Sequence, residues 1–238
     1  ALATNGNGAA LVVNDDGLNF AASTVGGALS ATATAGDMID SGALAITGTT
    51  TLVTSANDAT ITLNETSNAF TGAVTITTND NSGTDADVTI DGGTTALIIA
   101  ASTIDGDLTL LSGHASGITD SGTVTVGGNL AATTDANDGE ISLGTLAVDG
   151  TIALTTNGNG AALVVNDVGL NFAASTVGGA LTATATTGNI TQSGALAITG
   201  VTTLAADSSN NITLNNASNN FQGAVRITSG NNVTLVDS

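Results

Sequence analysis

The chain has 238 residues and a formal net charge of −19, with one arginine and no lysine. Proteins bind phosphate backbones and anionic lipids through lysine and arginine, so this composition argues against nucleic acid and membrane partners and favours cations. The absence of cysteine excludes disulfides and thiolate metal sites. No apolar run approaches the roughly 18 residues of a membrane-spanning helix, so we predict no membrane insertion. The richness in Val, Ile and Thr predicts a folded β-protein rather than a disordered chain.

Long internal repeats organise the chain. Residues 1–52 align without a gap with residues 153–204, and 43 of the 52 positions are identical. The match continues as ITLNETSNAFTGAVTIT at 61–77 and ITLNNASNNFQGAVRIT at 212–228. Because repeats of this kind decide the fold, we predict one continuous solenoid, with a first super-repeat at 1–152 and a partial second at 153–238. A weaker copy of the same skeleton lies about half a unit away, at residues 102–130.

A shorter period lies inside these units. The first inward apolar residue of each strand that follows a GxL-like turn recurs mostly at steps of 21 to 23 residues. These anchors are Leu29, Leu52, Val74, Leu108, Leu130, Ile152, Leu181, Leu204 and Val225. Two longer steps, of 34 and 29 residues, contain the segments 79–87 and 157–167. We interpret these two segments as loops or enlarged coils.

Each short period predicts three brief strands. Within 180–199 the expected strands are ALTATAT (180–186), NITQ (189–192) and ALAIT (195–199), with Gly or Asn between them. Apolar residues alternate with Thr or Ala, which indicates half-buried strands joined by tight turns. The fold class we predict is all-β, a right-handed parallel β-helix (β-solenoid) of about 22 residues per coil and roughly ten coils, with the four Phe in its core. Small β-sandwich domains would need units of about 90–100 residues, which the short period disfavours.

The segments VGGALTATATTGNITQSGALAITGVTTL (177–204) and NNITLNNASNNFQGAVRITSGNNVTLVDS (210–238) resemble repeats of large bacterial surface adhesins of the filamentous haemagglutinin type. The resemblance implies a long right-handed β-helix exported by two-partner secretion, and hence an extracellular or cell-surface location. It also implies adhesion, biofilm matrix or filament formation, without catalytic residues.

Single residues offer little catalytic chemistry. His114 lies in SGHASG, where we expect a solvated turn, because a lone histidine cannot form a zinc site. Arg226 takes the outward phase of AVRIT, so we expect it to be solvated. Asn-rich turns at 209–211, 215–216, 219–220 and 231–232 are expected to stack as Asn ladders along the axis, in a structural role.

Calcium is the most specific binding hypothesis, because it takes six to eight oxygen ligands from carboxylates, amides and carbonyls in turns. Two stretches are dense in such oxygens, NDNSGTDAD at 79–87 and TDANDGE at 134–140. The candidate ligands are Asp80, Asp85, Asp87, Asp135, Asn137, Asp138 and Glu140. Neither stretch matches the EF-hand or the nonapeptide calcium repeat, so solvated acidic turns are the alternative.

These observations together predict a structural and adhesive protein that is not an enzyme. We expect a stiff rod that associates with itself into filaments or lateral bundles, or that contacts exopolysaccharide or a host or neighbouring cell surface. The alternatives are a polysaccharide-active β-helix enzyme and a carbohydrate-binding module. The first would need basic and acidic residues clustered in a groove, and the second would need exposed aromatic platforms. The sequence has one arginine and neither Trp nor Tyr.

Overall fold

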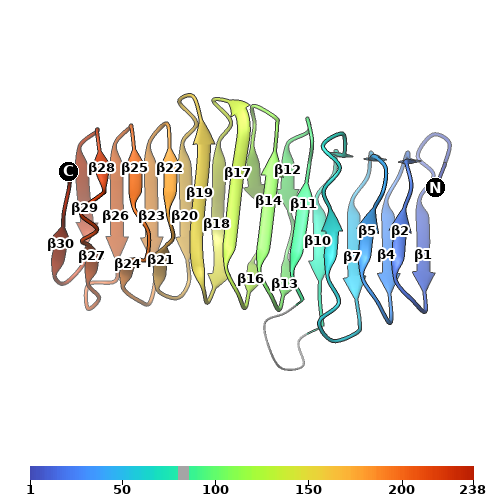
Figure 1. Cartoon of the computed structure of the whole chain (residues 1–238), viewed down its shortest axis with the longest axis horizontal. Coiled ribbons are helices and arrows are strands. Elements are labelled where there is room, and N and C mark those ends of the chain that lie inside the picture. Colours follow the sequence, from blue (N-terminus) through green and yellow to red (C-terminus); the bar gives the residue numbers. More distant parts are fainter. Residues whose placement is uncertain (80–85) are drawn as a thin grey trace.

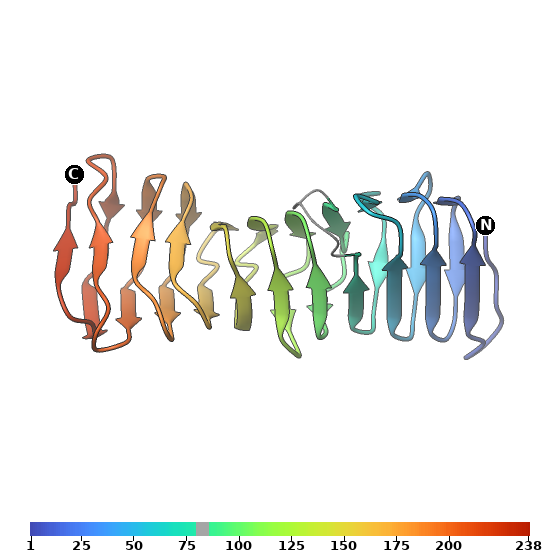
Figure 2. The same cartoon turned by 90° about the horizontal axis from the view of Figure 1, so that it is seen from below.

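The computed structural model describes residues 1–79 and 86–238, and within them every regular element is a β-strand. The strands wind into a β-solenoid of about ten turns, in which neighbouring strands lie side by side and parallel along the long axis (Figures 1 and 2). The first and last coils lie at opposite ends of the rod (Figure 1). In this part of the chain no helix is long and apolar enough to cross a membrane.

The strands of the described residues form three sheets, which we name sheet 1, sheet 2 and sheet 3. Sheet 1 contains, in spatial order, β1 (Ala10–Asn14), β4 (Leu29–Ala33), β7 (Thr50–Thr54), β10 (Val74–Thr77), β12 (Leu97–Ile99), β15 (Ile118–Asp120), β18 (Ile141–Val148), β20 (Ala162–Asn166), β23 (Leu181–Ala185), β26 (Thr202–Ala206) and β29 (Val225–Ser229), with β13 (Ser102–Ile104) and β16 (Val124–Val126) beside them.

Sheet 2 contains, in spatial order, β2 (Leu18–Phe20), β5 (Met38–Asp40), β8 (Ile61–Leu63), β11 (Val88–Asp91), β14 (Leu108–Ser112), β17 (Leu130–Asn137), β19 (Thr151–Asn157), β21 (Leu170–Phe172), β24 (Ile190–Gln192), β27 (Ile212–Leu214) and β30 (Val233–Leu235), with β22 (Ser175–Val177), β25 (Leu196–Ile198) and β28 (Asn220–Phe221) beside them. Sheet 3 is short and contains β3 (Ser23–Val25), β6 (Leu44–Ile46) and β9 (Ala69–Phe70).

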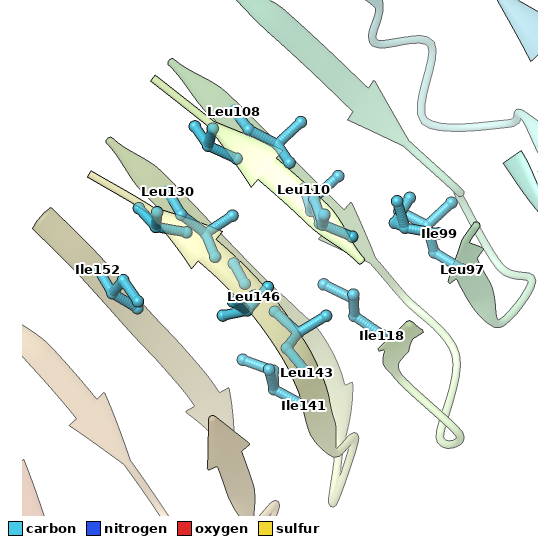
Figure 3. Close-up of a cluster of buried hydrophobic side chains, with 14 of the residues drawn as sticks. Leu97, Ile99, Leu108, Leu110, Ile118, Leu130, Ile141, Leu143, Leu146 and Ile152 are labelled. Carbon is cyan, nitrogen blue, oxygen red and sulfur yellow. The ribbon is translucent and has the colours of Figure 1, made fainter. Parts of the chain in front are cut away.

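The core is the column of inward side chains that alternation predicts. In β23, Leu181, Ala183 and Ala185 are buried, while Thr182 and Thr184 between them face outward. Figure 3 shows how sheet 2 and sheet 1 contribute facing rows in the middle coils, made by Leu108, Leu130 and Ile152 on one side and Leu97, Ile118 and Ile141 on the other. The expected core position of the four phenylalanines is confirmed for Phe20, Phe70, Phe172 and Phe221.

The spacing of the coils is set by the turns at the corners. Along sheet 1 the paired residues are 21 apart from Leu29 to Thr50 and 25 apart from Val74 to Ile99. Leu52, one of the predicted anchors, does not pair with the anchor Leu29, whose partner is Thr50. Leu52 pairs instead with Ala31 and Ile76, two residues further along their strands. The anchor Leu204 is displaced in the same way, because it pairs with Ala183 and Ile227. Alternation repeats every two residues, so it cannot separate registers that differ by two.

The half-unit repeat lies on a different face of the rod. Leu29 begins β4 in sheet 1, Leu108 begins β14 in sheet 2, and Leu181 begins β23 in sheet 1 again. At each of the two long steps the anchor therefore moves from one sheet to the other. Our interpretation of 157–167 as a loop or enlarged coil is wrong, since it contains β20, a regular strand of sheet 1. Most of 79–87 lies outside the described residues.

Some corners leave room only for glycine. A Cβ atom at Gly26 would collide with the carbonyl oxygen of Gly6 in the neighbouring coil, and Gly178 meets Gly158 in the same way one unit later. The recurring Gly-Gly pair of each unit thus follows from the close approach of successive backbones. These corners, with the strands between them, position the polar side chains of the turns in columns along the axis.

Candidate functional site

The polar side chains that the fold brings together form a column at the start of the sheet 2 strands. Each member directly precedes the first inward residue of its strand, as in Asp107–Leu108 and Asn129–Leu130. The backbone N–H groups at such a corner point along the axis and need acceptors in the adjacent coil. Short Asp and Asn side chains reach them, so the local sequence creates a ladder. We call this set the Asx column, and its acceptors are Asp37, Asp87, Asp107, Asn129, Asn189 and Asn211.

The hydrogen bonds of the Asx column run from coil to coil. Asp87 Oδ1 accepts the Asp107 N–H at 2.8 Å, and Asp107 Oδ1 accepts the Asn129 N–H at 2.6 Å. Asn129 Oδ1 then accepts both the N–H and the hydroxyl of Thr151 at 2.8 Å. The column resumes with Asn189, whose Oδ1 accepts the Asn211 N–H at 2.7 Å. The predicted Asn ladder is thereby confirmed at 211 and 231–232, where Asn211 Oδ1 accepts side-chain N–H groups of both residues.

A second polar arrangement is buried beneath a corner in each unit. In the first unit Asn68, which is 1% exposed, accepts the Leu44 N–H at 2.7 Å and donates to Asp40 Oδ2 at 2.7 Å. In the second unit Asn219 accepts the Leu196 N–H at 3.0 Å and exchanges two bonds with the side-chain amide of Gln192. These buried amides satisfy backbone groups that water cannot reach, so their role is structural.

The predicted calcium ligands fall in separate places. Asp80 and Asp85 lie outside the described residues, and Asp87 belongs to the Asx column. Asp135, Asn137, Asp138 and Glu140 are exposed around the turn between β17 and β18. Among residues 1–79 and 86–238, no three acidic or histidine side chains are grouped so that they could hold a metal ion. Calcium binding at these turns stays a prediction.

The turn between β17 and β18 is held by its own hydrogen bonds. Asp138 has a positive φ of 62° and accepts the Asn159 N–H of the next coil at 2.6 Å. Asn137 donates its amide to the other carboxylate oxygen of Asp138 at 3.3 Å. Oδ1 of Asp138 therefore joins two coils, in the same manner as the acceptors of the Asx column.

One carboxylate lies in an unusual electrostatic environment. Asp91 ends β11, is mostly buried, and accepts the Gly93 N–H at 2.7 Å. Burial raises the pKa of Asp91, and the negative charges of Asp135 and Asp40 raise it further, against the opposing effect of the Gly93 hydrogen bond. At Asp207 the hydroxyl and N–H of Ser209 instead lower the pKa of an exposed carboxyl.

The two residues singled out for possible catalysis lie apart from these columns. His114 is half-buried in the turn after β14, and its Nδ1 accepts the Ser116 N–H at 3.0 Å. The expected turn position is confirmed, although the ring is less solvated than predicted. Arg226 is exposed on β29, opposite Thr203, as expected.

The hollows of the surface repeat with the sequence. One, of about 370 Å³, lies beside Gly17 and Asp37, and another, of about 320 Å³, lies beside Gly169 and Asn189, which are the matching positions of the second unit. Each hollow opens where the start of a sheet 2 strand carries glycine rather than a side chain. The hollows are thus a by-product of the repeat, and their linings offer amides, carboxylates and backbone without a nucleophile–base pair.

Sequence reasoning overlooked four members of the Asx column, Asp37, Asp107, Asn129 and Asn189, and gave Asp87 a different role. A signal was present, because Asp or Asn stands directly before the inward residue in Asp-Met (37–38), Asp-Val (87–88), Asp-Leu (107–108), Asn-Leu (129–130), Asn-Ile (189–190) and Asn-Ile (211–212). This dipeptide recurs at the coil spacing. It was not recognised, because Asp87 was considered only as a calcium ligand, Asn211 only as part of an Asn-rich turn, and the other members were not considered.

Comparison with known proteins identifies a family through the repeats of the chain. Comparisons with curated proteins and with solved structures find no match. A family model described as repeats of unknown function matches three segments, residues 7–77, 85–143 and 159–228. The first and third segments are one unit of 152 residues apart, and the second includes the whole half-unit repeat at 102–130. Because these matches cover more than half of the chain, the protein belongs to the family of repeats of unknown function DUF5649.

Proposed function

We propose that this chain is a stiff structural rod, a segment of an extracellular bacterial adhesin or filament, and that it is not an enzyme. The observation that carries the proposal is the unbroken parallel pairing of eleven successive strands in sheet 1. Strands in such a sheet lie about 4.8 Å apart, so ten steps make a rod of about 48 Å. A fold of this kind gains length with each added coil, which suits a spacer or fibre.

Two features support stiffness. The inward side chains form one continuous apolar column, so bending the rod would open gaps in a packed core. The Asx column and the buried amides add side-chain hydrogen bonds between coils at the corners. A rod that is held both in its strands and at its corners transmits force and keeps a binding tip at a fixed distance.

The polar chemistry of the turns supports a structural role over catalysis. The carboxylates and amides of the Asx column accept backbone N–H groups, so their lone pairs serve the fold. His114 lies in the turn after β14 and Arg226 lies in β29, far apart along the rod. Neither the groove of a polysaccharide-active β-helix nor the aromatic platform of a sugar-binding module has an observation in its favour.

The resemblance to filamentous haemagglutinin-type adhesins supports the location and the partners. It favours secretion to the cell surface, with self-association, exopolysaccharide or another cell as the contact. The charge of −19 fits this setting, because it keeps rods soluble while divalent cations can bridge them.

Electron microscopy of the purified chain, with and without EDTA, tests the proposal. We expect thin rods with an axial repeat near 4.8 Å in both conditions, since the coils are held by backbone pairing. Rods that fall apart in EDTA would make the acidic turns cation sites on which the rod depends. Compact particles without the axial repeat would overturn the rod function.

A further inference from the structure

The tetrapeptide NGNG occurs twice in the chain, at residues 5–8 and 157–160, and each copy contains two Asn-Gly steps. Asparagine is one of the thermolabile residues of proteins, and its side-chain amide is lost most readily when glycine follows. Glycine has no Cβ atom to shield its backbone nitrogen, so this nitrogen can attack the amide carbon of the preceding asparagine. The asparagines Asn5, Asn7, Asn157 and Asn159 share this local sequence, and the structure separates them.

The turn after β19 holds one reacting pair together. Asn157 is the last residue of β19 and is exposed. The Gly158 N–H donates to Oδ1 of Asn157 at 2.8 Å, and Nδ2 of Asn157 donates to the carbonyl oxygen of Asp135 at 3.2 Å. Because a C=O bond is about 1.2 Å long, the Gly158 nitrogen lies at most about 4 Å from Cγ of Asn157. Reacting atoms need a separation of about 3–3.5 Å, so a small adjustment within the turn suffices.

The same turn keeps the next glycine nitrogen occupied. The Gly160 N–H donates to the main-chain oxygen of Asn157 at 3.1 Å, and Gly160 is buried. The hydroxyl of Thr156 donates to the carbonyl oxygen of Gly160 at 2.6 Å, which fixes this glycine from its other side. The Gly160 N–H must leave its hydrogen bond before its nitrogen can attack the side chain of Asn159. The fold therefore protects Asn159, although its side chain is exposed.

The first unit repeats this asymmetry. The Gly8 N–H donates to the main-chain oxygen of Asn5 at 3.1 Å, as Gly160 does one unit later. Gly6 and Gly158 have positive φ values of 56° and 62°, so the two turns have the same shape. In each tetrapeptide the second glycine nitrogen is thus held in the backbone bond that closes the turn. We therefore expect the same order in this unit, with Asn5 more reactive than Asn7.

From this geometry we infer that Asn157 is a site of spontaneous deamidation in the folded rod. The Gly158 nitrogen bonds to Cγ of Asn157 while its proton passes to Oδ1, which becomes the hydroxyl of a tetrahedral intermediate. The Cγ–Nδ2 bond then breaks, and ammonia leaves with the proton of this hydroxyl as the C=O bond forms again. Water opens the remaining cyclic succinimide at either carbonyl, which gives aspartate or isoaspartate at position 157.

The product weakens a contact between coils. Deamidation replaces the Nδ2 donor by a carboxylate oxygen, so the hydrogen bond to the Asp135 carbonyl is lost. The new charge lies near the carboxylate of Asp138, whose Oδ1 lies against Gly158. Isoaspartate also lengthens the main chain before Gly158, whose carbonyl oxygen packs against Gly178 in the next coil. Since β19 lies between the two ends of the rod, the rod loses stability with age in its interior (Figure 1).

Peptide mapping by mass spectrometry tests the site. The purified chain is incubated at mildly alkaline pH, sampled over weeks and digested with elastase, and electron-transfer fragmentation then distinguishes isoaspartate from aspartate. We expect Asn157 to deamidate at least ten-fold faster than Asn159 in the folded chain. In urea both residues precede glycine without a turn around them, so their rates should become equal. Asn5 and Asn7 provide the same comparison in the first unit.

Two matched variants connect the modification to stability. Asn157→Gln keeps a side-chain amide, but its longer side chain must close a larger ring and reacts much more slowly. Asn159→Gln makes the same change at the protected position. During the incubation the melting temperature of the wild-type chain and of Asn159→Gln should fall, while that of Asn157→Gln should stay constant. Circular dichroism of fresh samples verifies that both variants fold, and the mapping of the wild-type chain does not depend on them.

Other results would overturn the inference without affecting the proposed rod function. Equal rates at Asn157 and Asn159 in the folded chain would show that the turn does not select between them. An Asn157 that reacts in urea and stays intact in the folded chain would show that the fold protects this residue as well. A melting temperature of Asn157→Gln that falls as fast as that of the wild-type chain would refute the loss of stability at this turn.

Discussion

The first 52 residues and their copy at 153–204 fold alike, although nine positions differ. Three of the nine replace a carboxylate, since Asp16, Asp37 and Asp40 become Val168, Asn189 and Gln192. Asp37 accepts the Thr60 N–H at 2.8 Å, and Asn189 accepts the Asn211 N–H at 2.7 Å. The corners thus require an oxygen that accepts hydrogen bonds, and they do not require its charge.

Asp40 and Gln192 make the same point at a half-buried position. Asp40 accepts the N–H of Asn64 and the side-chain amide of Asn68, and Gln192 accepts the N–H of Asn216 and the side-chain amide of Asn219. Gln192 also donates to Asn219, which a carboxylate cannot do. The acidity of the first unit is therefore a property of its surface that the fold permits but does not need.

The largest difference between the units should appear when the buried asparagine becomes a carboxylate. Asn68→Asp places a second carboxylate against Asp40, whereas Asn219→Asp faces Gln192, whose amide can donate to it. We expect Asn68→Asp to lower the free energy of unfolding by about 3 kcal/mol at pH 7 and Asn219→Asp by about 1 kcal/mol. Urea unfolding of the two variants measures this, and equal losses would contradict the comparison.

A smaller effect, equal in both units, is expected at the buried threonines. The hydroxyls of Thr50 and Thr202 are buried without a hydrogen-bond partner, at matching positions of sheet 1. Replacing either by Val exchanges an unsatisfied hydroxyl for a methyl group of similar size, and should stabilise the chain by about 1 kcal/mol. Thermal unfolding of Thr50→Val, Thr202→Val and the double variant measures the gain. Destabilisation in either unit would indicate that the hydroxyl has a role.

The pH dependence of stability should reveal the effect of Asp91, a buried carboxyl of the first unit that lies near the charge of Asp40. The folded-state pKa of Asp91 is raised, chiefly by burial and also by the charges of Asp135 and Asp40. An acid with a raised pKa is favourable when protonated, so stability is lost as the pH rises through its unfolded and then its folded pKa. Asp91→Asn should therefore raise the melting temperature at pH 7 and leave it unchanged near pH 3. A gain of equal size at both pH values would exclude this cause.

The smallest effect is expected when Asp40 of the first unit is replaced by glutamine, the residue at the matching position of the second unit. Asp40→Gln keeps the acceptor oxygen and adds a donor, so the free energy of unfolding at pH 7 should change by less than about 0.5 kcal/mol. Asp40→Leu, the control, removes the acceptor from Asn64, Asn68 and their corner and should cost about 2 kcal/mol. Comparable losses in the two variants would mean that the charge of Asp40 is itself required.

Much of the fold was predictable because alternation and turn residues are local signals. The strands at 181–185, 190–192 and 196–198 lie where the sequence predicted them. What alternation cannot reveal is which face a strand joins, because every face needs the same inward pattern. Leu29 and Leu108 follow the same type of turn, yet corner lengths place them in sheets 1 and 2. The Asx column was missed for a related reason, since its members become neighbours only when the coils are stacked.

The way the chain is wound also determines how the rod would respond to pulling. One coil places about 21 residues, as from Leu181 to Thr202, within the spacing of a single strand. A coil peeled from the end would release about 70 Å of extended chain in place of about 4.8 Å of rod. Because the hydrogen bonds between coils lie along the axis, tension would open them one coil at a time. A tether of this design would lengthen stepwise and dissipate a sudden load, and single-molecule pulling would record this as a regular series of extensions.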